Sequence, residues 1–167
     1  DLANVIEEIE QTTARRFTDT FDQVKAAFSD IFAQLFEGGQ ADVYLLDPEK
    51  PLESGIEITA QPPGKRQQSL TLLSGGERAL TAIALLFAIL RVKPTPFCIL
   101  DEIDATLDEA NVHRFADLLS EFSKDLQLII VTHRRGTMEL ADAIYGVTME
   151  EMGVSKLLSL QLKKQAG

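Results

Sequence analysis

The first 36 residues carry apolar side chains at the spacing of a helix. The segment contains neither proline nor glycine, so it predicts one long helix over 2–36 that ends at Gly38-Gly39. In the second half of this helix the apolar positions are separated by steps of four and three: Phe17, Phe21, Val24, Phe28, Ile31 and Leu35. Such a pattern is typical of a coiled-coil seam, and also of an amphipathic helix that covers a domain. Both interpretations hold if a rod, residues 1–36, enters a globular unit, residues 37–167, near Phe17.

The remaining chain alternates short apolar runs with helical patterns. It predicts an antiparallel pair at 41–46 and 55–60, helices at 77–92, 108–123 and 137–142, strands at 97–100 and 127–132, and a last pair at 143–149 and 154–162. The strands 97–100 and 127–132 are almost continuously apolar and a helix separates them. We therefore expect an α/β fold with a parallel sheet that helices cover on both faces.

Composition narrows the class of protein. With 167 residues and 45% hydrophobic content, the chain is long enough for one domain with a sizeable core. The longest apolar stretch, 79–90, is too short to cross a bilayer, no signal peptide is evident, and the single cysteine excludes an internal disulfide framework. We expect a cytoplasmic protein without membrane contact. A net charge of −10 argues against a broad DNA-binding surface on this chain.

Acidic residues follow the first of the two buried strands. Asp101 closes that strand where a carboxylate can hold a Mg²⁺ ion shared with nucleotide phosphates, and Glu102 follows where it can activate a water molecule. His133 follows the second strand, where an imidazole can bind a γ-phosphate or the attacking water. Ligands of such sheets bind beyond the carboxyl ends of the strands, so these three side chains are expected at one edge.

The run Leu73-Ser74-Gly75-Gly76-Glu77 lies directly before a predicted helix. Bare glycine amides and a serine hydroxyl at the positive end of a helix dipole form an anion site. The alternative is an ordinary serine cap with a Gly-Gly turn.

The sequence contains no phosphate-binding loop of the form G-x-x-x-x-G-K-S/T. Its nearest approach, Pro63-Gly64-Lys65-Arg66, lacks the first glycine and the final hydroxyl residue, and predicts an exposed turn. ATP chemistry at this chain therefore requires a partner segment that carries the missing loop.

Several segments together resemble the C-terminal half of the head domain of structural maintenance of chromosomes (SMC) proteins, a branch of the ABC ATPases. They are 61–65, 73–77, 97–112, 132–138 and 145–149. The resemblance implies the C-terminal part of an ABC-type head with a coiled-coil neck helix. The continuation Glu109-Ala110-Asn111-Val112 is similar to the bacterial condensin branch.

By this resemblance, Leu73, Ser74, Gly75, Gly76 and Glu77 would form the signature motif that contacts ATP held by an opposite head. Asp101 would bind Mg²⁺, Glu102 would be the catalytic base and His133 the switch histidine. Ala105, Leu107 and Asp108 would belong to the D-loop at the dimer interface.

The implied partners are the N-terminal half of the same head, a second head and a kleisin subunit. DNA would be contacted through the full complex. The implied activity is ATP hydrolysis that drives head engagement for chromosome condensation, segregation or DNA repair at the nucleoid, and this chain alone would be inactive.

Two other classes stay open. The chain could be a binding module that docks a kleisin without any ATP chemistry. It could also be a nucleotide-binding fragment of an ABC transporter, which is weakened by Ile103-Asp104 after Glu102, where transporters usually place proline.

Overall fold

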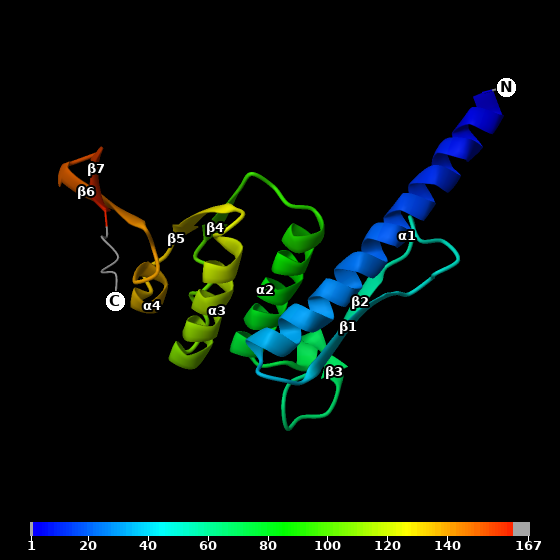
Figure 1. The fold of residues 1–167 in the computed structure, drawn as a ribbon, viewed down its shortest axis with the longest axis horizontal. Coiled ribbons are helices and arrows are strands. Elements are labelled where there is room, and N and C mark those ends of the chain that lie inside the picture. Colours follow the sequence, from blue (N-terminus) through cyan, green and yellow to red (C-terminus); the bar gives the residue numbers. More distant parts are fainter. Residues whose placement is uncertain (1, 162–167) are drawn as a thin grey trace.

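The computed structural model describes residues 2–161 as an α/β protein (Figure 1). Asp1 and residues 162–167, which include the last residue of the predicted strand 154–162, lie outside the described residues. Helix α1, Leu2–Leu35, projects from the body as a rod (Figure 1). Residues 2–11 of this helix are all exposed, whereas Phe28, Ile31 and Leu35 are buried. The helix thus runs free at its start and enters the core in its second half, as the apolar spacing predicts.

A small antiparallel sheet lies along α1. It consists of β1 (Gln40–Leu45), β2 (Ile56–Gln61) and β3 (Gln68–Ser69), and a short 3₁₀ turn, η1 (Leu70–Leu72), follows it. The first two strands were predicted, but β3 and η1 were not, because two or three residues carry no periodic signal. Gly39, at φ 76°, has no room for a side chain, since a Cβ there would meet the Gln61 carbonyl at 2.4 Å.

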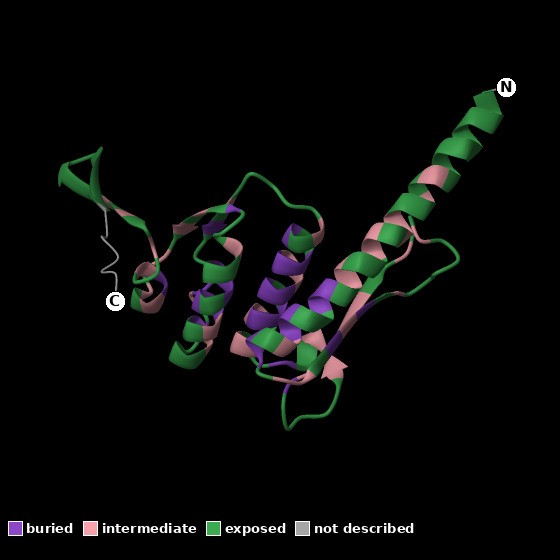
Figure 2. Ribbon diagram, in the orientation of Figure 1, coloured by how far each residue is buried: buried purple, intermediate pink, exposed green. Residues whose placement is uncertain are grey.

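The core lies where α1 meets two further helices. Helix α2, Gly75–Val92, and helix α3, Glu109–Phe122, bury the faces that they turn toward each other and toward α1 (Figure 2). The rings of Phe87 and Phe115 meet edge to face with centroids 6.2 Å apart. This contact holds α2, which begins with the glycine-rich run, against α3.

Strands β4 (Phe97–Asp101) and β5 (Gln127–Val131) form a parallel pair. The side chains on one face, such as Leu100, pack on the helices. The opposite face is bare, and its exposed apolar residues are Phe97, Ile99, Ile129 and Val131. The α/β class is confirmed, but the expectation of helices on both faces is wrong for this chain, because no described helix packs against that second face.

The described chain ends in a hairpin. After β5 comes α4, Arg135–Met138, which starts earlier and is shorter than the predicted helix at 137–142. Thr137, within this helix, is buried and its hydroxyl donates to Asp104. Strands β6 (Ala143–Glu151) and β7 (Val154–Gln161) then pair antiparallel, with an irregularity between Met149 and Glu151. None of the helices within residues 2–161 has the length and apolarity that a membrane crossing needs.

Candidate functional site

The glycine-rich run begins α2 with a capping box. Ser74 is the N-cap: its hydroxyl oxygen accepts from the Glu77 backbone N–H at 3.4 Å, and its own N–H donates to Glu77 Oε2 at 3.1 Å. The Ser74 hydroxyl also donates to Glu77 Oε2 at 2.8 Å. The serine-cap interpretation is therefore correct as local structure. A cap of this kind still leaves the amides of Gly75 and Gly76 at the positive helix end.

A lysine from the preceding loop forms an ion pair with the glutamate of this capping box. Lys65 Nζ lies 2.7 Å from Glu77 Oε1, and the Glu77 side chain is only 18% exposed. The hydrogen bond from Lys65, followed by those from Ser74, holds the pKa of Glu77 below its ordinary value against the opposing effect of burial. Lys65 sits in the predicted exposed turn, which Gly64 forms at φ 75°. Sequence reasoning assigned that turn to solvated surface and missed its ion pair with the motif.

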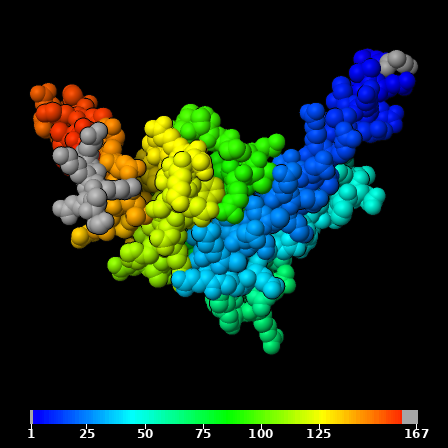
Figure 3. All heavy atoms as spheres, viewed as in Figure 1, coloured from blue at the N-terminus to red at the C-terminus, as the bar shows by residue number. Residues whose placement is uncertain are grey.

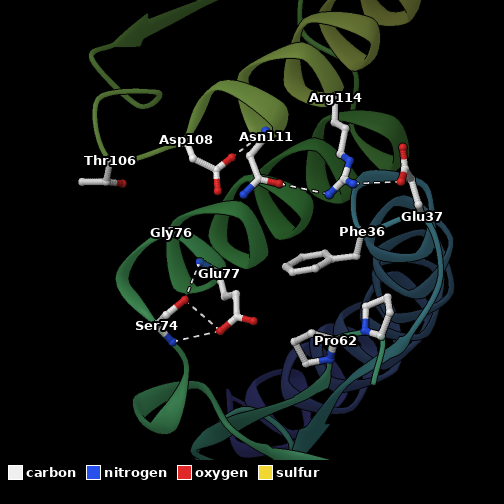
Figure 4. A pocket seen from close by; sticks show the side chains of 11 residues that line it. Phe36, Glu37, Pro62, Ser74, Gly76, Glu77, Thr106, Asp108, Asn111 and Arg114 are labelled. Carbon is white, nitrogen blue, oxygen red and sulfur yellow. Dashed lines mark hydrogen bonds and ion pairs between the residues drawn. The ribbon is translucent and has the colours of Figure 1, made fainter. Parts of the chain in front are cut away.

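An open pocket of about 580 Å³ lies beside this helix start (Figure 4). Ser74, Gly76 and Glu77 line one side of it, and Thr106 and Asp108 line another. A Cβ at Gly76 would stand 3.5 Å from the Thr106 carbonyl oxygen, so the two loops run close together here. The structure thus brings Ser74, Gly76 and Glu77 of the predicted signature and Asp108 of the predicted D-loop to one pocket.

Two of the predicted site residues point into the protein. The side chains of Leu73 and Leu107 are 3% and 1% exposed, so they anchor their loops in the hydrophobic core. Any contact of these two residues with a ligand must come from their backbone. Ala105 is half-buried, and Asp108 caps α3 by accepting from the Asn111 N–H at 2.8 Å.

A cation that the sequence did not single out also lines the pocket. Arg114 donates to Asn111 Oδ1 at 3.1 Å and to Glu37 Oε2 at 2.8 Å, as Figure 4 shows. Glu37 comes from the turn after α1 and adopts a left-handed backbone, φ 54°. Because Arg114 and Glu37 are 77 positions apart, only the fold brings them together.

The second predicted group lies at the carboxyl edge of the parallel strands. Asp101 is the register partner of Val131, and the Glu102 N–H donates to the Val131 carbonyl at 2.9 Å. His133 stands two residues further along, so all three predicted residues share this edge. Their side chains are exposed, and none has a hydrogen bond or ion pair to another described residue. Glu102 takes a left-handed backbone, φ 48°, which a glutamate adopts only at an energetic cost.

The two groups do not form one site within this chain. None of Asp101, Glu102 and His133 lines the pocket beside Ser74. Within residues 2–161, no cluster of three or more His, Cys, Asp or Glu side chains could hold a metal ion. A lone carboxylate such as Asp101 fits Mg²⁺ only as an ion that takes its other ligands from phosphates and water.

Comparisons with known proteins show the family of the chain. Residues 6–156 match the family described as RecF/RecN/SMC N terminal domain. The chromosome partition protein Smc of Bacillus subtilis (strain 168) is 59% identical over 163 residues, which cover 98% of this chain and 14% of that protein. The chain therefore spans about 14% of the length of the curated relatives it matches.

Solved structures share the fold. One, from work on ATP-driven dimerization and DNA-stimulated activation of SMC ATPases, superposes with a TM-score of 0.81 at 47% identity and 89% coverage of both chains. Another is an Smc head domain with an extended coiled coil, derived from Pyrococcus furiosus and bound to the C-terminal domain of ScpA. It has a TM-score of 0.84 at 48% identity and covers 95% of this chain and 40% of its own. Sequence motifs, fold and relatives agree, and the chain belongs to the RecF/RecN/SMC N terminal domain family.

Proposed function

We propose that this chain supplies two separate surfaces of a composite ATPase in an SMC head. The observation that carries the proposal is that the two motif groups do not share a site: the pocket beside Ser74 does not include Asp101, Glu102 or His133. One chain therefore offers a signature surface, 74–77, at one place and a hydrolytic edge, formed by Asp101, Glu102 and His133, at another. Two heads that face each other can complete both sites, each site taking one surface from each head.

We place the chain in the C-terminal half of such a head, although the family description names an N-terminal domain. The 167 residues contain no phosphate-binding loop, and the bare face of β4 and β5 exposes Phe97, Ile99, Ile129 and Val131. An apolar sheet face of this kind requires a covering partner. The N-terminal half of the same head, carrying the phosphate-binding loop, is the proposed occupant.

The roles at the hydrolytic edge follow from the chemistry of the side chains. Asp101 would hold Mg²⁺ together with the ATP phosphates, and the ion would neutralise charge on the transferring phosphoryl group. The side chain of Glu102, which has no hydrogen bond to another described residue, would accept a proton from the attacking water. His133 would hydrogen-bond the γ-phosphate or that water.

The signature surface would bind ATP held by the second head. Ser74, Gly75 and Gly76 present a hydroxyl and backbone amides at a helix N-terminus, and a Cβ at Gly75 would meet nothing within 4 Å. A structure with 47% identity comes from work on ATP-driven dimerization of SMC ATPases. We propose the same homodimeric engagement for the assembled head of this protein.

The two ends of the molecule would connect the head to the rest of its complex. The exposed apolar positions Leu2, Ile6 and Ile9 on the free part of α1 fit a coiled-coil neck over 1–36, with 37–167 as the lobe. In Figure 3 this rod and the β6–β7 hairpin stand out at opposite ends. Action at the bacterial chromosome, in the cytoplasm, would be through the full complex, because the net charge of −10 gives this chain no broad DNA surface.

The proposal is tested by mixing the chain with a segment that carries the phosphate-binding loop and measuring ATP turnover against protein concentration. We expect a rate per head that rises with concentration and is absent from either segment alone. Glu102→Gln should keep ATP binding, trap an ATP-bound dimer and abolish turnover, because an amide cannot accept the proton. Zero turnover in a well-folded wild-type complex at every concentration would overturn the ATPase proposal.

A specific observation also favours the binding-module alternative. The β6–β7 hairpin exposes Tyr145, Val147, Met149, Leu157 and Leu160, and an Smc head domain at 48% identity was solved bound to the C-terminal domain of ScpA. A kleisin is therefore a proposed partner of this hairpin in either case. Kleisin binding without any turnover in the assembled head would leave docking as the function of this chain.

A further inference from the structure

Two loops that follow neighbouring strands are fastened to each other by buried hydrogen bonds. Asp104, in the loop after β4, is 1% exposed. Its Oδ2 accepts from the Thr132 hydroxyl at 2.7 Å and from the Thr137 hydroxyl at 2.6 Å, both from the region after β5. Within the described residues, no Lys, Arg or His nitrogen lies within 4.0 Å of this carboxylate. Hydroxyl donors alone hold it, and a buried carboxylate needs such donors.

Arg134 makes the reciprocal connection from the second loop to the first. Its Nη2 donates to the carbonyl oxygens of Ala105 at 2.7 Å and Leu107 at 2.8 Å, and its backbone N–H donates to the Thr132 hydroxyl oxygen at 2.9 Å. The guanidinium is a planar, rigid group, so two bonds from it fix the direction of the loop backbone that it grips. Arg134 thus holds the predicted D-loop by its main chain.

In the sequence, His133 lies between two residues that hydrogen-bond to the loop after β4. Thr132 on one side and Arg134 on the other are both bonded to the segment 104–107. That segment contains Thr106 and is followed by Asp108, and both of these residues line the pocket beside Ser74. A close approach at Gly136, where a Cβ would meet Val112 Cγ1 at 2.9 Å, seats the region after β5 against α3. The wall of the pocket and the backbone of His133 therefore belong to one block.

We propose that Asp104 and Arg134 are positioning residues that lock the D-loop to His133, so that the pocket wall and the hydrolytic edge move as a unit. The inference rests on the proposed ATPase function. If a second head contacts Thr106 and Asp108, the displacement of that loop reaches His133 through four side-chain hydrogen bonds. Engagement at one site would then set the position of the switch histidine that belongs to the other.

The first test measures ATP turnover in the full chain assembled with a phosphate-loop segment. Arg134→Met removes the donors but keeps the length of the side chain. We expect kcat to fall about tenfold or more while KM for ATP stays within about twofold, because the change misplaces a group without removing a substrate contact. Arg134→Lys should recover part of the loss. Arg135→Met is the matched control, since Arg135 is 90% exposed and pairs only with Glu139 among the described residues, and it should match the wild type.

The second test asks whether Arg134 acts through His133. In a His133→Ala background, Arg134→Met should lower kcat by less than about twofold further, since the group that it positions is gone. If the two substitutions lowered kcat independently, so that their fold losses multiplied in the double variant, the proposal would be overturned. A wild-type kcat in Arg134→Met would overturn it as well. Should Arg134→Met fail to fold, Asp104→Asn and Thr137→Val weaken the hydrogen bonds of Asp104 that join the same two loops. Their losses in kcat should depend on His133 in the same way.

Hydrogen exchange of the full chain tests the lock without any turnover. The N–H groups of Ala105 and Leu107 each donate within their own loop at 3.1 Å, so their exchange reports on that loop. We expect Arg134→Met to speed exchange at 105–107 as well as at 132–137. Faster exchange in the second loop alone would overturn the lock. An inactive wild-type assembly would instead refute the ATPase proposal, which separates the two failures.

Discussion

The Glu77 carboxylate is shared between Lys65 and Ser74. One oxygen lies 2.7 Å from Lys65 Nζ, and the other accepts the Ser74 hydroxyl at 2.8 Å. The hydroxyl that the proposed function assigns to a phosphate is thus already donated within the chain. A phosphate that binds beside Ser74 must replace Glu77 as the acceptor of that hydrogen bond, and the negative charge of Glu77 would repel it. Lys65 offsets this negative charge, so the lysine reduces the electrostatic repulsion between the helix start and a bound anion.

Lys65→Met tests the strength of this ion pair. We expect the free energy of unfolding to fall by about 0.5 kcal/mol, because the lysine is half exposed and water screens much of the attraction. Denaturant unfolding measures the change. Lys156→Met is the control: its pair with Glu150 is more exposed, at 56% and 63%, and its loss should change stability less. An equal effect of the two substitutions would contradict a special role for Lys65.

The lowered pKa of Glu77 gives the stability of the chain a defined pH dependence. Because the folded-state pKa lies below the ordinary value of 4.5, the contribution of Glu77 is complete above that value and is lost as the pH falls through the lowered pKa. Urea unfolding between about pH 7 and about pH 3 should therefore show a smaller acid-side slope for Glu77→Gln than for the wild type. At neutral pH the variant should already be less stable. Parallel pH profiles would refute the assignment.

Much of the fold was predictable because its signals are long and periodic. Phe28, Ile31 and Leu35 follow the helical spacing and are buried, and the apolar runs of β4 and β5 pair in parallel as expected. Candidate site residues could be singled out where the chemistry sits on consecutive residues, as it does at Ser74 and at Asp101-Glu102, and their roles stay predictions. Local sequence carries that information directly.

The rest depends on contacts between distant positions. Arg114 meets Glu37 across 77 positions, and Arg134 grips Leu107 across 27, which no spacing rule anticipates. The bare face of the parallel sheet escaped prediction for a related reason. A continuous apolar strand indicates burial on both faces, but it does not say that the cover belongs to the same chain.

Ser74→Arg tests the signature surface in the assembled head. The substitution places a bulky cation where the glycine amides approach the ligand, and it removes the cap hydroxyl. We expect ATP binding to the phosphate-loop segment to persist while ATP-dependent dimers disappear, which light scattering after gel filtration detects in a Glu102→Gln background. Ser120→Arg, on the exposed surface of α3, is the control and should still dimerise. Dimers of normal abundance in Ser74→Arg would rule out this surface as the engagement site.

Glu102 combines a proposed catalytic role with a left-handed backbone at φ 48°, and the two can be separated experimentally. Asparagine tolerates this conformation better than glutamate does, so Glu102→Asn should raise the free energy of unfolding by up to about 1 kcal/mol. Turnover should be lost at the same time, because the base is gone. Glu53→Asn is the control, since Glu53 is a loop glutamate without positive φ, and its effect should stay within about 0.5 kcal/mol. A gain in stability with loss of activity would show that the strain is kept for function, whereas no gain would mean that the loop relaxes around Glu102 without cost.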